Sequence, residues 1–188
     1  MFEKLISKLG QLLSKNKIPY MIIGGQAVLL YGTPRLTKDI DITLGISTDR
    51  VADIVRLCRS AKFKILPENY KDFVSKTFVL PVKDKVSEIR IDFIFSFTPY
   101  EHQAIARSKK VKIGSVSVNF ASVEDVIIHK IFAGRPRDIE DTKNIILKNS
   151  KMNIIYIKKW LSEFEKTFKG TNYTGVFKKV LNEMKRRH

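Results

Sequence analysis

The sequence contains one cysteine, Cys58, and no apolar run near the roughly 18–20 residues that a membrane-spanning helix needs. A lone cysteine cannot form a disulfide within the chain, and Cys58 stands in an apolar helical pattern. We therefore expect a buried thiol in a reducing compartment, the cytoplasm. Residues 1–15 alternate Leu and Ile with Lys and lack the unbroken apolar centre of a signal peptide. These absences exclude a disulfide scaffold and predict a cytoplasmic protein without a membrane partner.

Acidic residues are also scarce, since 19 Asp and Glu stand against 35 Lys and Arg, a formal net charge of +16. Such an excess favours a polyanionic partner, most commonly nucleic acid. A proteome in which every surface is rich in lysine is the other explanation. Two basic clusters favour a partner: residues 107–112, and residues 151–188, which hold ten Lys or Arg against three Glu. We expect the basic C-terminal helices to bind a phosphate backbone.

A chain of 188 residues with 44% hydrophobic side chains is long enough for one well-packed domain and a helical appendage. Helices are predicted over residues 2–15, 25–31, 49–61, 99–107, 122–134, 139–148, 154–168 and 175–187. Strands are predicted over residues 19–23, 38–44, 73–82, 88–97, 110–113 and 116–120, with turns at 83–85 and 114–115. Strands mixed with helices, followed by helices alone, predict an α+β fold with a mixed β-sheet flanked by helices. We expect a core over residues 1–121 and an all-helical C-terminal region over 122–188.

The clearest chemical signal is a Gly-Gly turn after an apolar run, in Ile22-Ile23-Gly24-Gly25. Because glycine has no Cβ, the backbone N–H groups of this turn are able to approach a phosphate where the next helix begins. Asp39 and Asp41 follow at positions i and i+2 of a predicted strand, so both point to the same face. Adjacent carboxylates repel unless a hard divalent cation such as Mg²⁺ neutralises them. The pattern predicts metal-dependent chemistry on a nucleotide.

A third acidic residue, Asp92, lies in the alternating strand pattern of residues 88–95, on the same face as Arg90. A lone Asp-Ile-Asp is a common surface-strand pattern, and only its combination with the Gly-Gly turn and Asp92 favours a metal site. Three carboxylates on neighbouring strands need a cation because an unpaired buried carboxylate is costly. The three histidines have no ligand spacing with Cys58 or with one another, which excludes a zinc site.

These motifs resemble the nucleotidyltransferase superfamily of the DNA polymerase β type, in which a Gly-Gly or Gly-Ser turn opens a helix. Asp-x-Asp follows on the next strand, and a third acid lies on a later strand. Gly-Gly-x-Ala at 24–27 and Arg-x-Thr-x-Asp-Ile-Asp at 35–41 are most similar to the abortive-infection (AbiEii-like) toxin nucleotidyltransferases and their aminoglycoside-modifying relatives. Lys130, followed by Arg-Asp-x-x-Asp at 137–141, extends the resemblance over residues 18–148. Gln26 stands where the toxin family often has a hydroxyl residue.

The resemblance implies transfer of a nucleoside monophosphate from an NTP to an acceptor hydroxyl, with release of pyrophosphate and Mg²⁺ or Mn²⁺ as cofactor. Asp39, Asp41 and Asp92 would be the catalytic metal ligands. Asp92 would also share a second metal or take the proton of the acceptor hydroxyl. The residues implied in nucleotide binding are Gly24, Gly25, Arg35, Thr37, Lys38, Lys130 and Asp138.

Several of these side chains also have a purely structural explanation. Lys130 fits a solvated helix face, and Arg137 with Asp138 fits a local ion pair worth at most about 1 kcal/mol if exposed. Asp141 is expected to be a charge in the first turn of a helix. Trp160 is expected to pack its helix, and stacking on a base is the alternative.

The leading hypothesis is a Mg²⁺-dependent nucleotidyltransferase that acts on RNA such as a tRNA end. It would be a toxin with an antitoxin protein as partner, or an RNA-modifying enzyme. A small hydroxylated acceptor such as an aminoglycoside, or a protein side chain, is the alternative. Cationic aminoglycosides need an acidic pocket, however, and this chain is basic. A third hypothesis is an inactive nucleotidyltransferase fold used as a binding module, but such a chain should have lost an acid or the Gly-Gly turn.

Overall fold

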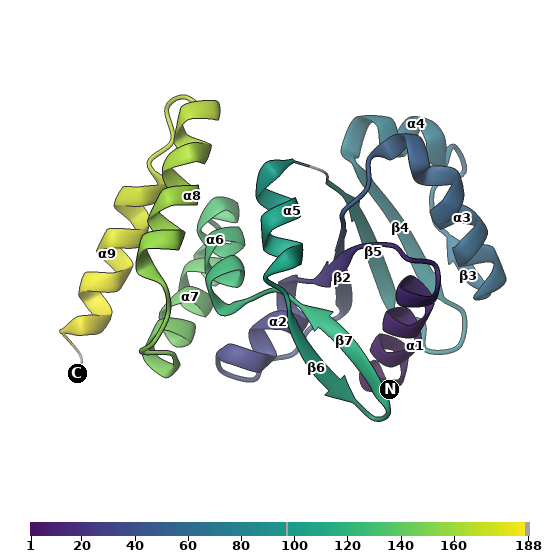
Figure 1. The fold of residues 1–188 in the computed structure, drawn as a ribbon, viewed down its shortest axis with the longest axis horizontal. Coiled ribbons are helices and arrows are strands. Elements are labelled where there is room, and N and C mark those ends of the chain that lie inside the picture. Colours follow the sequence, from purple (N-terminus) through teal and green to yellow (C-terminus); the bar gives the residue numbers. More distant parts are fainter. Residues whose placement is uncertain (97, 187–188) are drawn as a thin grey trace. The chain divides into compact units, whose positions relative to one another are not determined.

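The structure, a computed structural model, describes residues 1–96 and 98–186 (Figure 1). The chain forms two compact units: unit 1 comprises Met1–Gln26 and Leu36–Ala121, and unit 2 comprises Ala27–Arg35 and Ser122–His188. The predicted α+β class is confirmed, because a mixed sheet with flanking helices comes first and helices alone follow. The domain boundary expected near residue 121 stays a prediction. In the part of the chain that is described, no helix is long and apolar enough to cross a bilayer.

Unit 1 is built on a seven-stranded sheet in the order β3-β4-β5-β2-β1-β7-β6. In chain order the strands are β1 (Tyr20–Ile22), β2 (Asp39–Leu44), β3 (Phe63–Ile65), β4 (Val79–Asp84), β5 (Arg90–Phe95), β6 (Lys109–Ile113) and β7 (Val116–Phe120). The central strand β2 is parallel to β5 and antiparallel to β1. The helical segments of this unit are α1 (Phe2–Lys15), a 3-10 turn (Thr48–Arg50), α3 (Val51–Ser60), α4 (Tyr70–Thr77) and α5 (Pro99–Ala106). Helix α2 (Gly24–Tyr31) begins in unit 1 and continues into unit 2.

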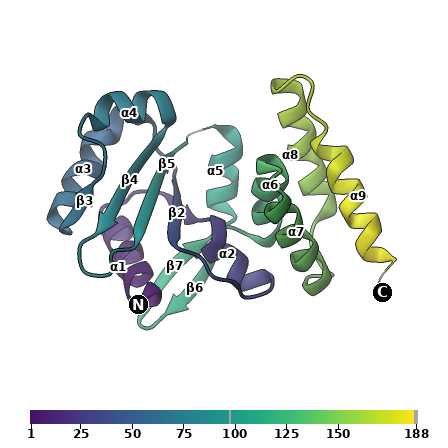
Figure 2. The ribbon, with the colours of Figure 1, turned by 180° about the vertical axis from the view of Figure 1, so that it is seen from behind.

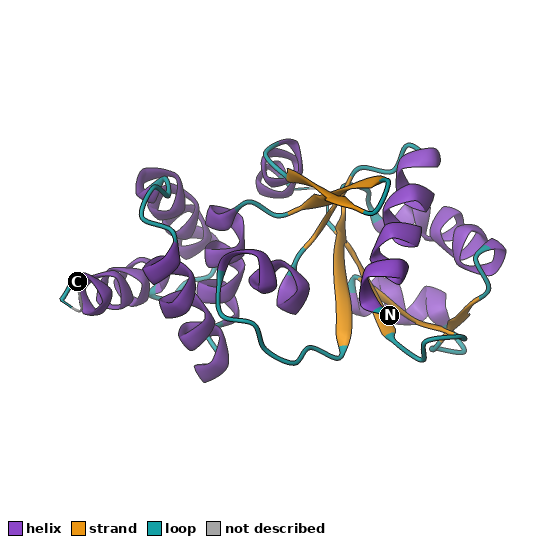
Figure 3. Ribbon diagram, turned by 90° about the horizontal axis from the view of Figure 1, so that it is seen from below, coloured by secondary structure: helices purple, strands orange, loops and turns teal. Residues whose placement is uncertain are grey.

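The two faces of the sheet differ in polarity because side chains alternate along each strand. One face is apolar and buried, with Ile40, Ile42, Ile91 and Phe93 at its centre. Helices α1 and α3 lie on this side, as Figure 3 shows edge-on, and a Cβ at Gly10 of α1 would come within 2.8 Å of Val118. The opposite face carries the acidic residues of β2 and β5, and we call it the acid face. The centre of the apolar face is therefore fully buried, whereas the acid face is buried at Met21 and Thr43 and only half-buried at its three aspartates.

Up to residue 186, where the described part of unit 2 ends, this unit contains four helices besides its part of α2: α6 (Val123–Ala133), α7 (Pro136–Lys148), α8 (Ile154–Thr167) and α9 (Tyr173–Lys185). Ser122 caps α6 by accepting a hydrogen bond from the Asp125 N–H, as its sequence position predicts. The ring of Phe132 packs against Phe164 of α8, Phe168 just after α8 and Tyr173 of α9, at centroid distances of 5.3 to 5.4 Å. Trp160 packs near Phe164 on the same helix, in line with the expected structural role.

The strand predicted over 73–82 is wrong in its first half, where residues 70–77 form α4. Asn69 caps this helix by accepting from the Asp72 N–H, and Lys76 pairs with Asp72 one turn away. Local capping thus outweighs the alternating apolar pattern. The turn predicted at 83–85 lies two residues later, at 85–87, because Asp84 stays in β4 and accepts hydrogen bonds from Ser87. Strand β3 was missed, since three residues give too short a pattern.

The other predicted elements agree with the structure to within a few residues. Helix α7 begins three residues earlier than predicted, with Pro136 at its first position. Cys58 is buried as expected, and burial raises the pKa of its thiol to about 12. Phe97, His188 and the end of the last predicted helix at Arg187 lie outside the described residues.

Candidate active site

Three carboxylates gather on the acid face of unit 1. Asp39 and Asp41 are two residues apart on β2, and Asp92 lies on the neighbouring parallel strand β5. The register places Asp41 directly beside Asp92, and Asp39 beside Arg90. All three aspartates are half-buried, in contrast to the fully buried isoleucines next to them in sequence, Ile40, Ile42 and Ile91. The structure therefore brings together the three acids that the sequence predicted as metal ligands.

Gly24 lies directly against this group. Its φ angle is +63°, in the left-handed region that favours glycine, and a Cβ built there would be 1.8 Å from the Asp41 Oδ2. The neighbouring Ile23 N–H donates a hydrogen bond to the Asp41 carbonyl at 3.0 Å. The Gly24-Gly25 turn, which begins α2, is thus fixed beside the carboxylate. Any side chain at residue 24 would displace that carboxylate.

Thr37 orients the first acid of the group. It is 9% exposed, and its hydroxyl lies 3.3 Å from both the carbonyl oxygen and the Oδ1 of Asp39. Lys38, between them in sequence, is exposed. The sequence predicted both residues as nucleotide ligands. The structure gives Thr37 a direct contact with Asp39, and this contact suits a positioning role.

Arg90 is a functional candidate that the sequence analysis placed beside Asp92 without giving it a role. Its Nε donates to the Asp92 Oδ1 at 2.8 Å, while its side chain stays 53% exposed. The hydrogen bond from Arg90 to Asp92 and the negative charges of Asp92, Asp39 and Asp41 raise the pKa of the Arg90 guanidinium above its ordinary value. The three neighbouring carboxylates therefore make the local field negative. A cation is stabilised there.

The carboxylates also fit a divalent metal ion. They offer hard oxygen donors on one face, at adjacent register positions. The negative charges that raise the pKa of Arg90 also attract a metal cation. Within residues 1–96 and 98–186 they do not form a closed ligand set, and Arg90 occupies one oxygen of Asp92. The second carboxylate oxygen of Asp92 is able to bind a metal while Arg90 holds the first.

Two buried polar side chains near the acids lack a hydrogen-bond partner in the described part of the chain. Gln26, 5% exposed, follows the Gly-Gly turn, and its Nε2 is unpartnered. Thr43, 1% exposed, lies two residues after Asp41 on the same face, and its hydroxyl is unpartnered. An unsatisfied buried group costs about 1–3 kcal/mol, and native proteins retain few such groups. No sequence signal marked either residue as unsatisfied.

The remaining predicted nucleotide ligands form a charge cluster within unit 2. Lys130 is 6% exposed, and its Nζ lies 2.6 Å from the Asp138 Oδ1 and 3.0 Å from the Asp141 Oδ2. Arg35 contacts Asp141 with two nitrogens at 2.9 Å each, and Arg135 contacts Asp138 at 2.5 Å. Two buried carboxylates thus meet three cations, in a geometry that satisfies Lys130 without a ligand.

The cluster differs from the expectations for its members. Asp138 is buried and pairs with Lys130 of α6 as well as locally with Arg135, and Asp141 is buried beyond the first turn of α7. Burial by itself would raise the pKa of Asp138, but the hydrogen bonds from Arg135 and Lys130, together with their charges, outweigh it and lower that pKa. Participation of Arg35, Lys130 and Asp138 in nucleotide binding stays a prediction.

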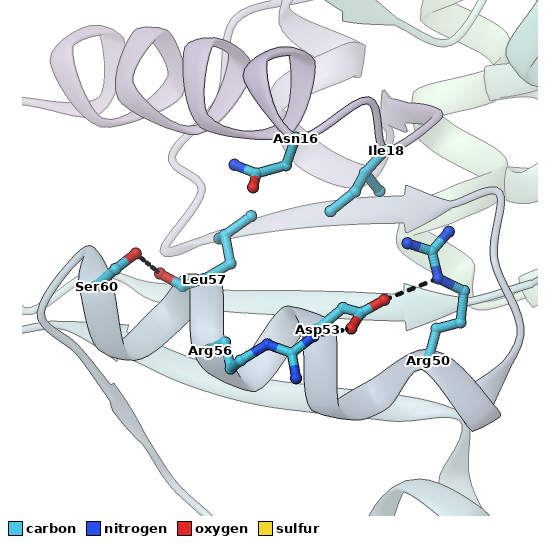
Figure 4. A pocket seen from close by; sticks show the side chains of 7 residues that line it. All are labelled: Asn16, Ile18, Arg50, Asp53, Arg56, Leu57 and Ser60. Carbon is cyan, nitrogen blue, oxygen red and sulfur yellow. Dashed lines mark hydrogen bonds and ion pairs between the residues drawn. The ribbon is translucent and has the colours of Figure 1, made fainter.

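A pocket of about 400 Å³ lies elsewhere in unit 1 (Figure 4). It is lined by Asn16, Ile18, Arg50, Asp53, Arg56, Leu57 and Ser60. Two of these residues lie just before β1, and the other five lie in the 3-10 turn and α3. The first residue of β1 pairs with the last residue of β2, so the pocket is near the end of β2. Arg50 and Arg56 both pair with Asp53 at the surface. This pocket is at the opposite end of β2 from Asp39, so it is distinct from the candidate active site.

Comparison with known proteins identifies the class. A family described as nucleotidyltransferases of unknown function (DUF6036) matches residues 1–184, and the chain belongs to that family. The protein is therefore a nucleotidyltransferase. No curated protein matches the sequence.

Solved structures show the same fold at low sequence identity. The antibiotic-resistance factor ANT(2'')-Ia in solution has a TM-score of 0.58 and 15% identity over 88% of this chain and 92% of its own. A nucleotidyltransferase-like antigenic protein from Paracoccidioides brasiliensis has a TM-score of 0.56 and 16% identity, over 88% and 87%. The lincosamide adenylyltransferase LnuA, bound to lincomycin, has a TM-score of 0.50 and 16% identity, over 72% and 90%. At these identities the likeness extends to the fold.

Proposed function

We propose that this nucleotidyltransferase uses Mg²⁺ or Mn²⁺ to transfer a nucleoside monophosphate from an NTP to a hydroxyl group of RNA. The observation that carries the proposal is the arrangement of Gly24, Asp41 and Asp92. Gly24, which has no side chain, lies against the Asp41 carboxylate, and Asp41 lies directly beside Asp92 in the sheet. Such an arrangement has room for phosphates on one side and attracts a cation on the other.

Each residue then has a defined part in the reaction. Gly24 and Gly25 present backbone N–H groups to the triphosphate, and Asp39, held by Thr37, joins Asp41 and Asp92 in holding the metal. A metal held by these residues would supply positive charge against the phosphate oxygens. The acceptor oxygen bonds to the α-phosphorus while the bond to pyrophosphate breaks. The hydroxyl proton passes to Asp92, the outermost of the three acids toward β5.

The charge of the chain supports RNA as the acceptor. A net charge of +16 suits a polyanion and repels a cationic aminoglycoside. The fold likeness to ANT(2'')-Ia and LnuA supports a small hydroxylated acceptor as the second candidate. Within the RNA hypothesis, a toxin inhibited by an antitoxin protein is the biological role that the motif resemblance favours.

The test is incubation with Mg²⁺, total RNA and each of the four α-³²P-labelled NTPs, followed by a denaturing gel. We expect label on an RNA band, and we expect Asp41→Asn to reduce it by about 10²–10³-fold, because loss of one metal ligand removes several kcal/mol of charge stabilisation.

Asp49→Asn, at an exposed carboxylate on the 3-10 turn, is the matched control and should keep full transfer. The Asp41→Asn protein should unfold at the wild-type temperature, since the change keeps the shape of the side chain. Full transfer by Asp41→Asn would contradict the assignment of the metal ligands. Label on a small molecule rather than on RNA would favour the second candidate.

A further inference from the structure

The acid face carries a straight row of cations that the proposed reaction does not use. Lys64 on β3 pairs in register with Lys83 on β4, Lys83 pairs with Arg90 on β5, and Arg90 pairs with Asp39 on β2. The four strands are direct neighbours in the sheet (Figure 2). We call Lys64, Lys83 and Arg90 the cationic row. It runs across the strands and ends on the first acid of the candidate active site.

The position of the row separates it from the nucleotide turn. Neighbouring strands are about 4.8 Å apart, so the row spans about 10 Å and reaches Asp39 after about 14 Å. It lies on the β5 side of β2, the side of Asp92. The Gly24-Gly25 turn follows β1, on the other side of β2. Under the proposed function, the triphosphate is bound on the β1 side and the acceptor arrives on the β5 side.

The row has a cost for the folded chain. Like charges directly opposite each other in neighbouring strands destabilise a sheet, and here Lys faces Lys and Lys faces Arg. Lys83 is in contact with Glu88, and Arg90 is held by Asp92. Lys64 is exposed and has no ion-pair partner among the residues that the structure describes. A bound polyanion would compensate the whole row.

We propose that the cationic row binds the phosphate backbone of a single-stranded RNA acceptor and leads its terminal hydroxyl to Asp92. The inference rests on the proposed function and names the path of its acceptor. A row of about 10 Å is longer than one phosphate group and fits successive phosphates of a strand. Arg90, whose partner Asp92 is also a predicted metal ligand, joins the row to the reacting groups.

Binding of a fluorescein-labelled single-stranded oligoribonucleotide, without NTP or metal, tests RNA binding by the cationic row separately from the reaction. Lys64→Ala/Lys83→Ala should bind this probe about five- to tenfold more weakly at low salt. The slope of log K against log salt should fall by about 1.4, since each lost phosphate contact in a single strand contributes about 0.7.

The matched control is Lys4→Ala/Lys15→Ala. These two lysines are exposed on α1, outside both basic clusters, and their removal changes the net charge equally. Helix α1 packs on the apolar side of the sheet, away from the acid face. Binding by the control should change by less than twofold. The unfolding temperature of Lys64→Ala/Lys83→Ala should stay equal or rise, because like charges no longer face each other.

A kinetic measurement then tests whether the RNA bound by the cationic row is the acceptor of the reaction. In transfer to the same RNA, Lys64→Ala/Lys83→Ala should raise the KM for RNA five- to tenfold and leave the KM for NTP unchanged. Equal losses of RNA binding in both double variants, or no loss in either, would overturn the inference. A rise in the KM for NTP in place of that for RNA would overturn it too. If the wild-type protein transfers no label but Lys64→Ala/Lys83→Ala alone loses RNA binding, the proposed function is rejected. RNA binding by the cationic row is then still supported.

Discussion

Gly24 is the residue at which backbone geometry and chemistry meet most closely. The left-handed φ of +63° disfavours a side chain, and the Asp41 carboxylate occupies the space that a Cβ would take. For Gly24→Ala we expect a destabilisation of about 1–2 kcal/mol from the backbone alone. We also expect transfer to fall at least about 100-fold, because Asp41 must move. Thermal unfolding and initial rates of transfer check the two effects.

Gly114 offers the matched control at the same scale. Its φ is +61°, and a Cβ there meets nothing within 4 Å. Gly114→Ala should therefore show a similar loss of stability and keep normal transfer. Equal rates for the two variants would mean that the place of Gly24 beside Asp41 is unimportant for the chemistry.

At the scale of elements, helices α6 and α7 are joined by the charge cluster around Lys130. Removal of one partner of a buried ion pair leaves an uncompensated charge, which costs about 3–5 kcal/mol. Lys130→Met should destabilise the protein by this amount, because it leaves Asp138 and Asp141 with fewer cations. Denaturant unfolding measures the change. Arg135→Met, at a 74% exposed side chain of the same cluster, should cost under about 1 kcal/mol.

The same variants separate structure from nucleotide binding. If Lys130 binds the triphosphate, Lys130→Met raises the KM for NTP under conditions in which the variant is folded. If the cluster is only structural, the folded variant has the wild-type KM. The resemblance predicts the first result, whereas two carboxylate contacts within 3.0 Å favour the second.

At the scale of the whole molecule, acid should destabilise the protein through both units. Burial would raise the pKa of Asp84, but hydrogen bonds from Ser87 and the charge of Lys8 outweigh it, so its pKa is lowered, as is that of Asp138. A carboxylate whose pKa is lowered by folding stabilises the fold at pH values above 3.8, the ordinary pKa of an aspartate. This stabilisation is lost as the pH falls through the pKa of the folded state.

We therefore expect the free energy of unfolding to be steady down to about pH 5 and to fall steeply below about pH 4. The net charge of +16 rises further as carboxylates are protonated, and self-repulsion adds to the loss. Urea unfolding over this pH range measures the effect. Asp84→Asn and Asp138→Asn should be less stable at neutral pH and less sensitive to acid. A wild-type curve that is flat to pH 3 would contradict the assignment.

The sequence determined the local features of this protein. Alternation by two residues placed Asp39 with Asp41, and Arg90 with Asp92, on common faces, because side-chain direction in a strand is a property of the strand alone. Helical periodicity and caps located most elements for the same reason. Prediction from sequence patterns failed at α4, where a cap at Asn69 competes with an alternating pattern. It also failed at β3, which is too short to show an alternating pattern.

Only the tertiary structure decided which residues face one another across strands and helices. Asp41 beside Asp92, Lys64 opposite Lys83, and Lys130 between two aspartates each depend on register and packing between segments far apart in the chain. Register is fixed by the burial of the apolar face as a whole and by the turns that join the strands. No local pattern contains that information. The acids, and Arg90 beside Asp92, were therefore predictable from the sequence, while the pairing of Asp41 with Asp92 and of Arg90 with Lys83 became visible only in the folded sheet.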